Sequence, residues 1–119
     1  MTEITLPWPP SDLSPNARLH WAKQSKAKKN YRHACWAETL MANPPKIADA
    51  GKLRLELIFY RPTKRVFDRD NLLARMKSGL DGVSDALKIN DCRFEPILVS
   101  VADDVGGFVK VRIFNEEEL

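Results

Sequence analysis

The chain has 119 residues, of which 44% are hydrophobic and 29% are charged, an ordinary balance for a soluble globular protein. This length predicts one domain over residues 1–119 and excludes two independent domains. No apolar run approaches the roughly 18 residues that a membrane span requires, and the N-terminal segment lacks the basic and apolar order of a secretory signal. We therefore expect a cytoplasmic protein without a membrane partner.

Positive charge gathers in two segments, although the formal net charge is only +3. Between Leu13 and Ala37 there are six basic residues and no acidic one, and a second basic group follows from Arg61 to Arg69, whereas Glu116–Glu118 form an acidic tail. Clustered cations favour a polyanion such as DNA, because each neutralised phosphate releases counterions; a solvated helix face would give the same pattern. The candidate DNA contacts are Lys23, Lys26, Lys28, Lys29, Arg32, Lys64, Arg65, Arg69 and Arg75.

In chain order, alternating apolar residues predict a short strand at Glu3–Trp8, and a loop rich in Pro, Asn and Ser extends from Ser11 to about Gln24. Helical spacing of apolar residues predicts a helix over Ser25–Ala42, which Asn43-Pro44-Pro45 would stop. The clearest strand is Lys52–Tyr60, where leucines and a phenylalanine recur at every second position.

The second half of the chain predicts a basic loop at Arg61–Phe67 and an amphipathic helix from Asp70 to Leu87. After a break near Asn90-Asp91, the apolar runs Phe94–Val101 and Phe108–Phe114 are separated by Asp and Gly residues and predict a terminal β-hairpin. The predicted fold is a small two-layer α/β (α+β) domain of order β-α-β-α-β-β, with a mixed sheet and two helices.

Isolated Cys, His and aromatic residues give weaker signals. Cys35 and Cys92 are too few for a disulfide framework and lack zinc-site spacing, so we expect buried free thiols. His20 and His33 have no ligand cluster beside them, which favours surface or core histidines over zinc ligands. Four aromatic residues lie among or beside the basic residues and would either stack on unpaired bases or pack in the core: Trp8, Trp21, Trp36 and Tyr31.

Two aspartates stand at the entrance of the second predicted helix, in the segment Phe67-Asp68-Arg69-Asp70-Asn71. The chain is still extended there, so both carboxylates can point to one side, and carboxylate oxygens are ligands that Mg²⁺ takes. The competing interpretation is structural, because Asp70 is a good N-cap for the helix that follows, and Asp at a helix start suits the helix macrodipole.

Two further charges share a helix stripe with Asp70. Lys77 lies within about 20° of the direction of Asp70, and Asp81 about 20° to the other side. An ordinary ion pair between Lys77 and Asp81 is the simpler alternative to a site. Asp91 lies in the loop that follows this helix; it would return to Asp68 and Asp70 if the last hairpin folds back on the sheet, or it simply forms an Asn-Asp turn.

With these residues, the chain resembles the RusA family of Holliday-junction resolvases, small endodeoxyribonucleases of bacteria and their phages. The resemblance covers nearly the whole chain. It rests on the opening strand and Pro-rich turn Ile4–Ser11, the motif Asp68-x-Asp70-Asn71-Leu72, the spacing Lys77-x-x-x-Asp81, and Asn90-Asp91 before the last two strands.

The resemblance implies a homodimer that resolves four-way DNA junctions by paired nicks, using Mg²⁺, with Mn²⁺ as a substitute. It places the catalytic, metal-binding aspartates at Asp68, Asp70 and Asp91, and gives Lys77 the role of stabilising charge on the phosphate. One departure concerns this lysine, because Ala74 occupies the family's lysine position. A three-residue insertion, close to one helical turn, would move the role to Lys77, and Arg75 is its competitor.

Two other functions stay open at the level of sequence. One is a noncatalytic module that binds branched or single-stranded DNA, in which the carboxylates are caps and ion-pair partners. The other is a Mg²⁺-dependent nuclease that acts on flaps or forks.

Overall fold

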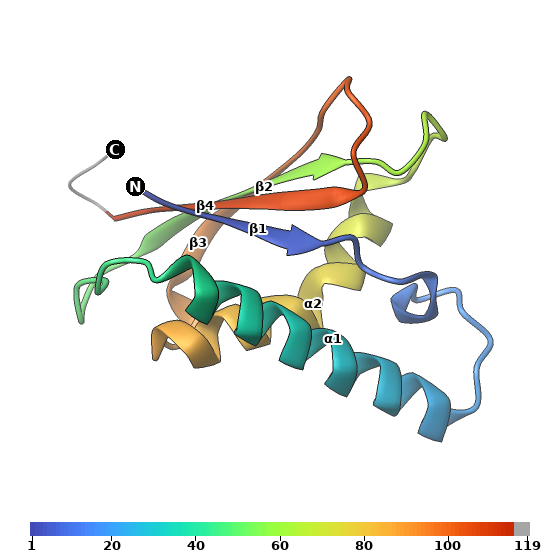
Figure 1. The fold of residues 1–119 in the computed structure, drawn as a ribbon, viewed down its shortest axis with the longest axis horizontal. Helices are drawn as coiled ribbons and strands as arrows, with labels where there is room; N and C mark the ends of the chain where they lie inside the picture. Colours follow the sequence, from blue (N-terminus) through green and yellow to red (C-terminus); the bar gives the residue numbers. More distant parts are fainter. Residues whose placement is uncertain (116–119) are drawn as a thin grey trace.

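The computed structural model describes residues 1–115 and shows a two-layer α+β domain in which both helices lie on one face of a four-stranded sheet (Figure 1). The expected class and the order β-α-β-α-β-β are confirmed. Glu116–Glu118 lie outside the described residues, and no helix within residues 1–115 is long and apolar enough to cross a membrane. The elements are β1 (Thr2–Pro7), η1 (Ser11–Leu13), α1 (Trp21–Ala42), β2 (Leu53–Tyr60), α2 (Arg69–Leu87), η2 (Asp91–Arg93), β3 (Phe94–Val101) and β4 (Phe108–Phe114).

Alternating side chains form three of the strands. In β1, β2 and β4 every second residue is buried under the helices, and the residues between them lie on the other face of the sheet. The buried set of β2 is the one that the sequence predicted: Leu53, Leu55, Leu57 and Phe59. Most of β3 is exposed, because the helices cover this edge strand less than they cover β1 at the other edge.

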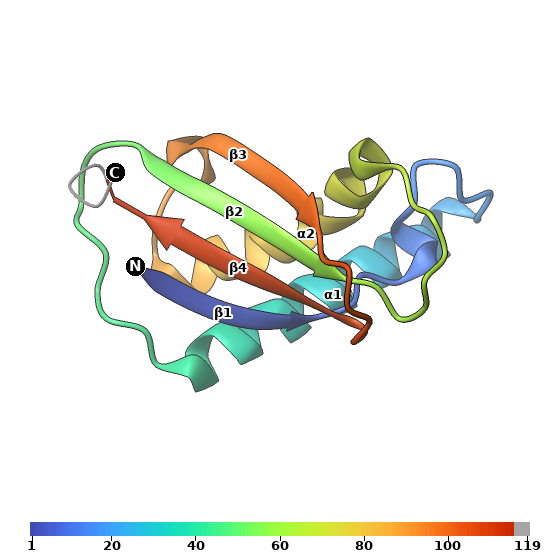
Figure 2. The ribbon, with the colours of Figure 1, turned by 90° about the horizontal axis from the view of Figure 1, so that it is seen from above.

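The strand order is β1-β4-β2-β3, which corrects the pairing of the predicted terminal hairpin (Figure 2). β4 lies antiparallel between β1 and β2, and β3 pairs in parallel with β2. The last two strands therefore follow each other and run in opposite directions, but β2 separates them. β2, α2 and β3 form a β-α-β unit, the crossover connection that parallel strands require.

The loop between β3 and β4 explains why these strands do not pair. Residues 102–107 pass over the end of β2 and hydrogen bond to its backbone. The N–H of Ala102 donates to the carbonyl of Phe59 at 2.9 Å, and the N–H of Gly107 donates to the carbonyl of Tyr60 at 2.8 Å. Gly107 has a φ of 80°, a conformation that favours glycine. The loop thus brings the chain to the other side of β2, where β4 pairs with both β2 and β1.

α1 begins four residues before the predicted start at Ser25. Trp21 opens the helix, and the Nδ1 atom of His20 caps it by accepting a hydrogen bond from the N–H of Ala22 at 3.3 Å. The predicted end is confirmed, because Asn43 adopts a left-handed φ of 46° directly after the helix. The early start adds a turn that carries exposed residues beyond the sheet.

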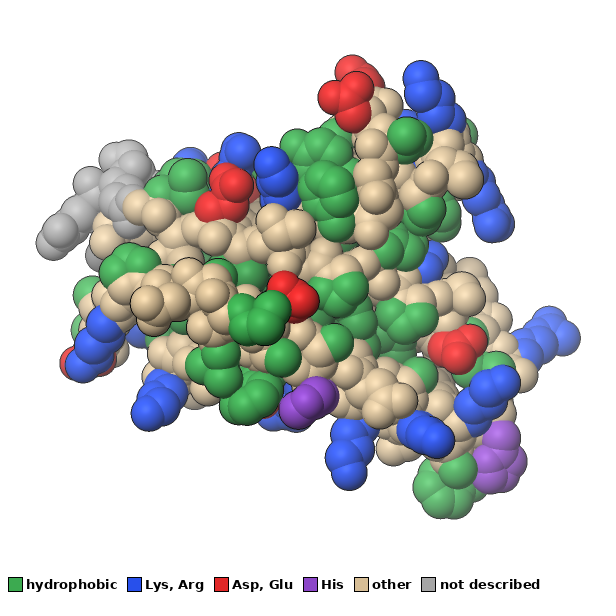
Figure 3. All heavy atoms as spheres, viewed as in Figure 1, with side chains coloured by type: hydrophobic (Ala, Val, Ile, Leu, Met, Phe, Trp, Pro, Cys, Tyr) green, Lys and Arg blue, Asp and Glu red, His purple; other side chains and the backbone are tan. Residues whose placement is uncertain are grey.

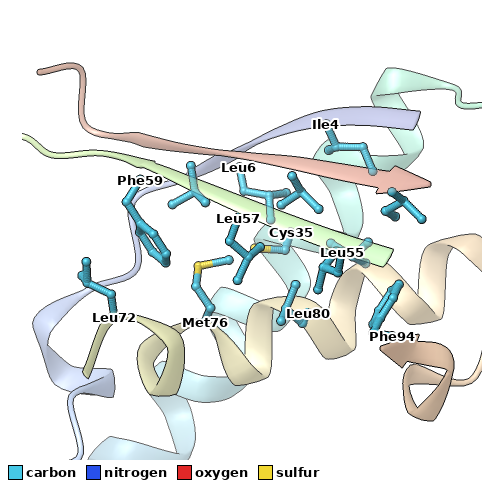
Figure 4. Packing of buried hydrophobic residues seen from close by; sticks show 14 of the residues in the cluster. Ile4, Leu6, Cys35, Leu55, Leu57, Phe59, Leu72, Met76, Leu80 and Phe94 are labelled. Carbon is cyan, nitrogen blue, oxygen red and sulfur yellow. The ribbon is translucent and has the colours of Figure 1, made fainter. Parts of the chain in front are cut away.

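α2 packs its apolar stripe against the sheet. Leu72, Met76 and Val83 are fully buried, and Figure 4 shows Leu72 and Met76 below Phe59 and Leu57 of β2. The N-cap of this helix is Asp68 and not Asp70, the residue for which the sequence suggested this structural role; Asp70 lies in the first turn. One buried layer between sheet and helices therefore makes the core.

Both cysteines are free thiols, as expected. Cys35 is buried in the core, but the expectation of burial is wrong for Cys92, which is exposed next to Asp91. Residues 91–93 form a short 3-10 turn at the surface, which keeps the Cys92 side chain out of the core.

The two helices touch closely at two glycines of α2. A Cβ atom on Gly82 would lie 2.1 Å from the backbone carbonyl oxygen of Arg32 on α1, and one on Gly79 would lie 2.5 Å from the Tyr31 ring. Both glycines thus have a packing reason, because any side chain at Gly82 would push α1 away from α2.

We predict that Gly82→Ala lowers the free energy of unfolding by about 2 kcal/mol, although Ala is the better helix former by about 1 kcal/mol. Gly79→Ala is the comparison and should cost less, because it meets side-chain atoms that can shift, whereas Gly82 meets backbone. Urea unfolding of the three proteins measures both effects. A Gly82→Ala variant as stable as the parent would show that the helices do not pack this closely.

Candidate functional site

The polar stripe predicted on α2 lies on the face turned away from the core. Asp70 and Lys77 are exposed and Asp81 is half-buried, while the apolar residues between them point to the sheet. The helical spacing therefore predicted correctly which residues of α2 face away from the core. A hollow of about 290 Å³ on this face is lined by Lys77, Asp81 and Asp91, together with apolar side chains that include Phe94 and Ile97.

Asp91 lies beside Asp81. After α2, Lys88 adopts a left-handed φ of 57° and turns the chain back along the helix. The Asn90 side chain then accepts a hydrogen bond from the N–H of Cys92 at 3.0 Å and fixes the 3-10 turn. This turn brings Asp91 next to Asp81, so that both side chains line the same two hollows. Two acidic side chains ten positions apart thus meet at one point of the surface.

The pKa of Asp81 is raised above the ordinary aspartate value. The largest cause is partial burial, and the negative charges of Asp91 and Asp85 raise the pKa further. Arg32 opposes these effects and lowers the pKa of Asp81. Arg32 itself forms a two-pronged ion pair with Asp85, with N–O distances of 2.7 and 3.0 Å, and this pair lowers the pKa of Asp85. Among Asp81, Asp85 and Asp91, Asp85 is the one that forms an ion pair with a basic side chain in the described residues.

The structure does not bring Asp91 together with Asp68 and Asp70. Asp68 accepts a hydrogen bond from the N–H of Asp70 at 2.9 Å at the start of α2. Eleven residues of helix, about 16 Å of rise, separate Asp70 from Asp81, which is the neighbour of Asp91. Across residues 1–115 no three His, Cys, Asp or Glu side chains gather as a metal site would require.

The β-α-β topology is the reason for this separation. Asp68 and Asp70 follow β2 and therefore lie at the carboxyl ends of the parallel strands. Asp91 precedes β3, so it lies at the opposite, amino ends. The expected return of Asp91 depended on a terminal hairpin, and that pairing is absent from the described sheet.

Arg75 is not at the surface, where it was expected to contact DNA. Its side chain is only 7% exposed, and its Nη2 atom donates to the carbonyl of Pro9 at 2.6 Å. The guanidinium also lies 5.9 Å from the ring centre of Trp8 and 5.7 Å from that of Phe67. Arg75 thus ties α2 to the Pro-rich turn, and Lys77 is the residue that projects from the exposed stripe.

Most other predicted DNA contacts are exposed. The lysines of α1 lie in its first half, which extends beyond the sheet in Figure 1, and Figure 3 shows Lys and Arg side chains along this edge. The loop after β2 lies towards the same end of the molecule in Figures 1 and 2. Arg32 is exposed but paired with Asp85. The exposed basic surface contains Lys23, Lys26, Lys28, Lys29, Lys64, Arg65 and Arg69.

Only part of the aromatic set could stack on bases. Trp21 is 75% exposed at the start of α1, and Trp36 is partly exposed and stacked on His33. Tyr31 is buried and donates its hydroxyl proton to the carbonyl of Pro7 at 2.7 Å. Trp8 packs on Phe59 in the core. Core packing is thus the outcome for Tyr31 and Trp8.

Sequence reasoning missed the approach of Asp81 to Asp91 and the pair of Arg32 with Asp85. It treated Asp81 as a partner for Lys77, but no ion pair joins these two side chains in the described part of the chain. The available signal was the spacing of Asp81 and Asp85, which repeats one turn along α2 and marks a second acidic position on the same face.

Comparison with known proteins leaves the family open. No family model matches the sequence. An uncharacterized protein of Xylella fastidiosa is 46% identical over 98 residues, which is 79% of this chain. The chain spans 63% of the length of that relative. The name of that relative states no activity.

We predict that the carboxyl of Asp81 titrates above the ordinary aspartate pKa of about 4. Asp91→Asn should lower the pKa of Asp81 without restoring the ordinary value, because burial is its largest cause. Arg32→Gln should raise the pKa further, because a neighbouring cation is lost. Carboxyl ¹³C shifts followed against pH measure all three.

The same shift makes stability depend on pH. The folded-state pKa of Asp81 is raised, so binding of a proton to Asp81 stabilises the folded protein. This contribution is fully present below the ordinary pKa of aspartate, and it is lost as pH rises through the raised pKa. Asp81→Asn should therefore remove this loss of stability over the pH range between the ordinary and the raised pKa. A pKa of Asp81 that neither Asp91→Asn nor Arg32→Gln moves would contradict the arrangement.

Proposed function

We propose that the chain is a divalent-metal-dependent endodeoxyribonuclease that cuts branched DNA, with Asp81, Asp91 and Lys77 at its active site. The observation that carries this proposal is the approach of Asp81 to Asp91 on an exposed face that also presents Lys77. The exposed lysines of α1 lie on the neighbouring helix. The ordered motifs that resemble the RusA family favour a four-way junction as the substrate.

The metal set implied by the resemblance does not fit this chain, because Asp91 lies far along α2 from Asp68 and Asp70. The pair Asp81 and Asp91 does fit, since Mg²⁺ is commonly held by one or two carboxylates with water molecules as its other ligands. Mn²⁺ takes the same oxygen ligands. When bound, such an ion supplies an activated water and neutralises charge on the leaving oxygen.

The chain's own residues account for binding and orientation. Lys77 carries its positive charge next to the acidic pair, where it would contact a phosphate oxygen of the DNA strand. The basic surface of α1 would hold the arms of the junction through phosphates, so recognition depends on shape more than on base sequence. Without a cation, the two carboxylates repel a phosphate, and cleavage should therefore stop in a chelator while DNA binding persists.

Two nicks in one junction need two active sites. The pair of Asp81 and Asp91 gives each chain one proposed active site, so a two-fold homodimer would supply the second site. A nuclease that acts on chromosomal or phage DNA in bacteria also works in the cytoplasm, which is where we place this protein.

A noncatalytic DNA-binding module is the second candidate. Two observations favour it: Asp68 is a helix cap, and residues 1–115 contain no group of three metal-binding side chains. Such a module would bind branched or single-stranded DNA equally well with and without Mg²⁺.

We predict that the protein nicks a synthetic four-way junction in Mg²⁺ but not the matched linear duplex, and that Asp91→Asn reduces the rate at least about 100-fold, the scale of losing one group that stabilises transition-state charge. Asp104→Asn removes a carboxylate from an exposed loop and is the matched control, with a rate near that of the parent. Flap and fork substrates belong in the same assay. Junction binding without cleavage in any divalent metal would favour the binding module. Preferred cleavage of flaps or forks would identify those structures, and not the four-way junction, as the substrate.

We predict that Lys26→Ala with Lys29→Ala weakens binding to every DNA and reduces the slope of log K against log salt by up to about 2, roughly one for each lost phosphate contact. Lys46→Ala with Lys88→Ala removes the same charge beyond the C-terminal ends of the two helices and should leave the slope unchanged. Equal slopes of log K against log salt for the two double variants would show that the DNA does not bind along the lysines of α1.

A further inference from the structure

A cavity of about 330 Å³ opens between α1 and α2, beside the acidic pair. Gln24 and Lys28 of α1 form one wall, and Lys77 and Ser78 of α2 form the other. Leu13 lies at the end contributed by the segment before α1. We call this space the interhelix cavity.

The interhelix cavity is positively charged. Lys28 and Lys77 are exposed on opposite walls, and neither forms an ion pair with a carboxylate in the described residues. Arg75 also contributes to the wall, and its buried guanidinium bonds to the neutral carbonyl of Pro9. Asp81 is the acidic residue of this lining. Three cations therefore face one anion, which favours an anionic ligand.

Two polar atoms at the cavity lack partners. The hydroxyl of Ser78 and the Nε atom of Arg75 are buried, and no hydrogen bond satisfies either within residues 1–115. A buried donor without an acceptor costs about 1–3 kcal/mol. Both residues line the interhelix cavity. Turning the Ser78 hydroxyl about χ1 towards a bound anion would give it the missing acceptor.

The size of the cavity exceeds that of a bare phosphate. Its volume of about 330 Å³ lies at the lower end of pockets that hold small organic ligands. Leu13, Pro15 and Ala74 add apolar surface to the lining. The combination of cations with apolar wall matches a phosphate that carries a sugar and a base.

We propose that the interhelix cavity binds one nucleotide, with Lys28 and Lys77 on its phosphate and the Leu13 end against its sugar or base. The cavity shares Lys77 and Asp81 with the proposed active site. The inference rests on the proposed function in one respect, because we take the nucleotide to belong to a DNA strand. A free nucleotide has the same chemistry and is the other source.

The test is an amide NMR titration of the full chain in a chelator, so that no cleavage occurs. The ligands are 2′-deoxyadenosine 5′-monophosphate, deoxyadenosine, inorganic phosphate and a single-stranded oligo-deoxyadenylate. We expect the monophosphate to shift the amides of Gln24, Lys28 and Ser78 with saturation, and deoxyadenosine to leave them unmoved. Lys28→Gln should weaken this binding about tenfold, the scale of one hydrogen bond to a charged group. Lys46→Gln is the charge-matched control and should bind as the parent does.

Each alternative result is decisive. Absent shifts at millimolar monophosphate, or equal losses in Lys28→Gln and Lys46→Gln, overturn the proposal. Inorganic phosphate that binds as tightly as the monophosphate overturns its nucleotide part. Tighter binding of the oligonucleotide at the same amides supports the DNA strand as the source, and tighter binding of the monophosphate overturns that source. Because the titration needs no metal, nucleotide binding without junction cleavage would refute the proposed nuclease alone.

Discussion

Parallel pairing of β2 with β3 is the constraint on which the arrangement of this molecule depends. It requires α2 to cross the sheet from the carboxyl end of β2 to the amino end of β3. Carboxylates therefore lie near both ends of the helix. Asp68 and Asp70 lie at its start, and Asp91 follows its end. Close contact at Gly82 then fixes α1 against α2, so the basic helix lies beside the acidic pair.

Local patterns in the sequence were sufficient for the elements but not for their pairing. The alternation in β2 and the apolar stripe of α2 each reflect a single buried face, which can be recognised without knowing the neighbour. β3 and β4 lie close in sequence and both are rich in apolar residues, so a hairpin was the simplest expectation. The strand pairing and the loop's hydrogen bonds to Phe59 and Tyr60 show that the chain crosses β2 instead. Pairing depends on such long-range contacts, which no local pattern encodes.

The candidate site shows the same limit. Helical spacing placed Lys77 and Asp81 on one exposed stripe correctly, since that follows from the geometry of one helix. The expected approach of Asp91 to Asp68 and Asp70 depended on the hairpin, and the observed strand pairing keeps these residues apart within one chain. Arg75 was expected at the surface because it is charged. Its burial depends on Trp8 and Pro9, which belong to a segment distant in sequence, as well as on Phe67 just before α2.

We propose that the active site lies at Asp81 and Asp91, and not at the start of α2. The decisive experiment compares the initial rates of junction cleavage in Mg²⁺ for Asp81→Asn and Asp70→Asn, with circular dichroism confirming that both variants fold. We expect Asp81→Asn to lose cleavage at least about 100-fold and Asp70→Asn to stay within a few-fold of the parent. Loss of cleavage in Asp70→Asn with cleavage retained in Asp81→Asn would contradict it and return the site to the start of the helix.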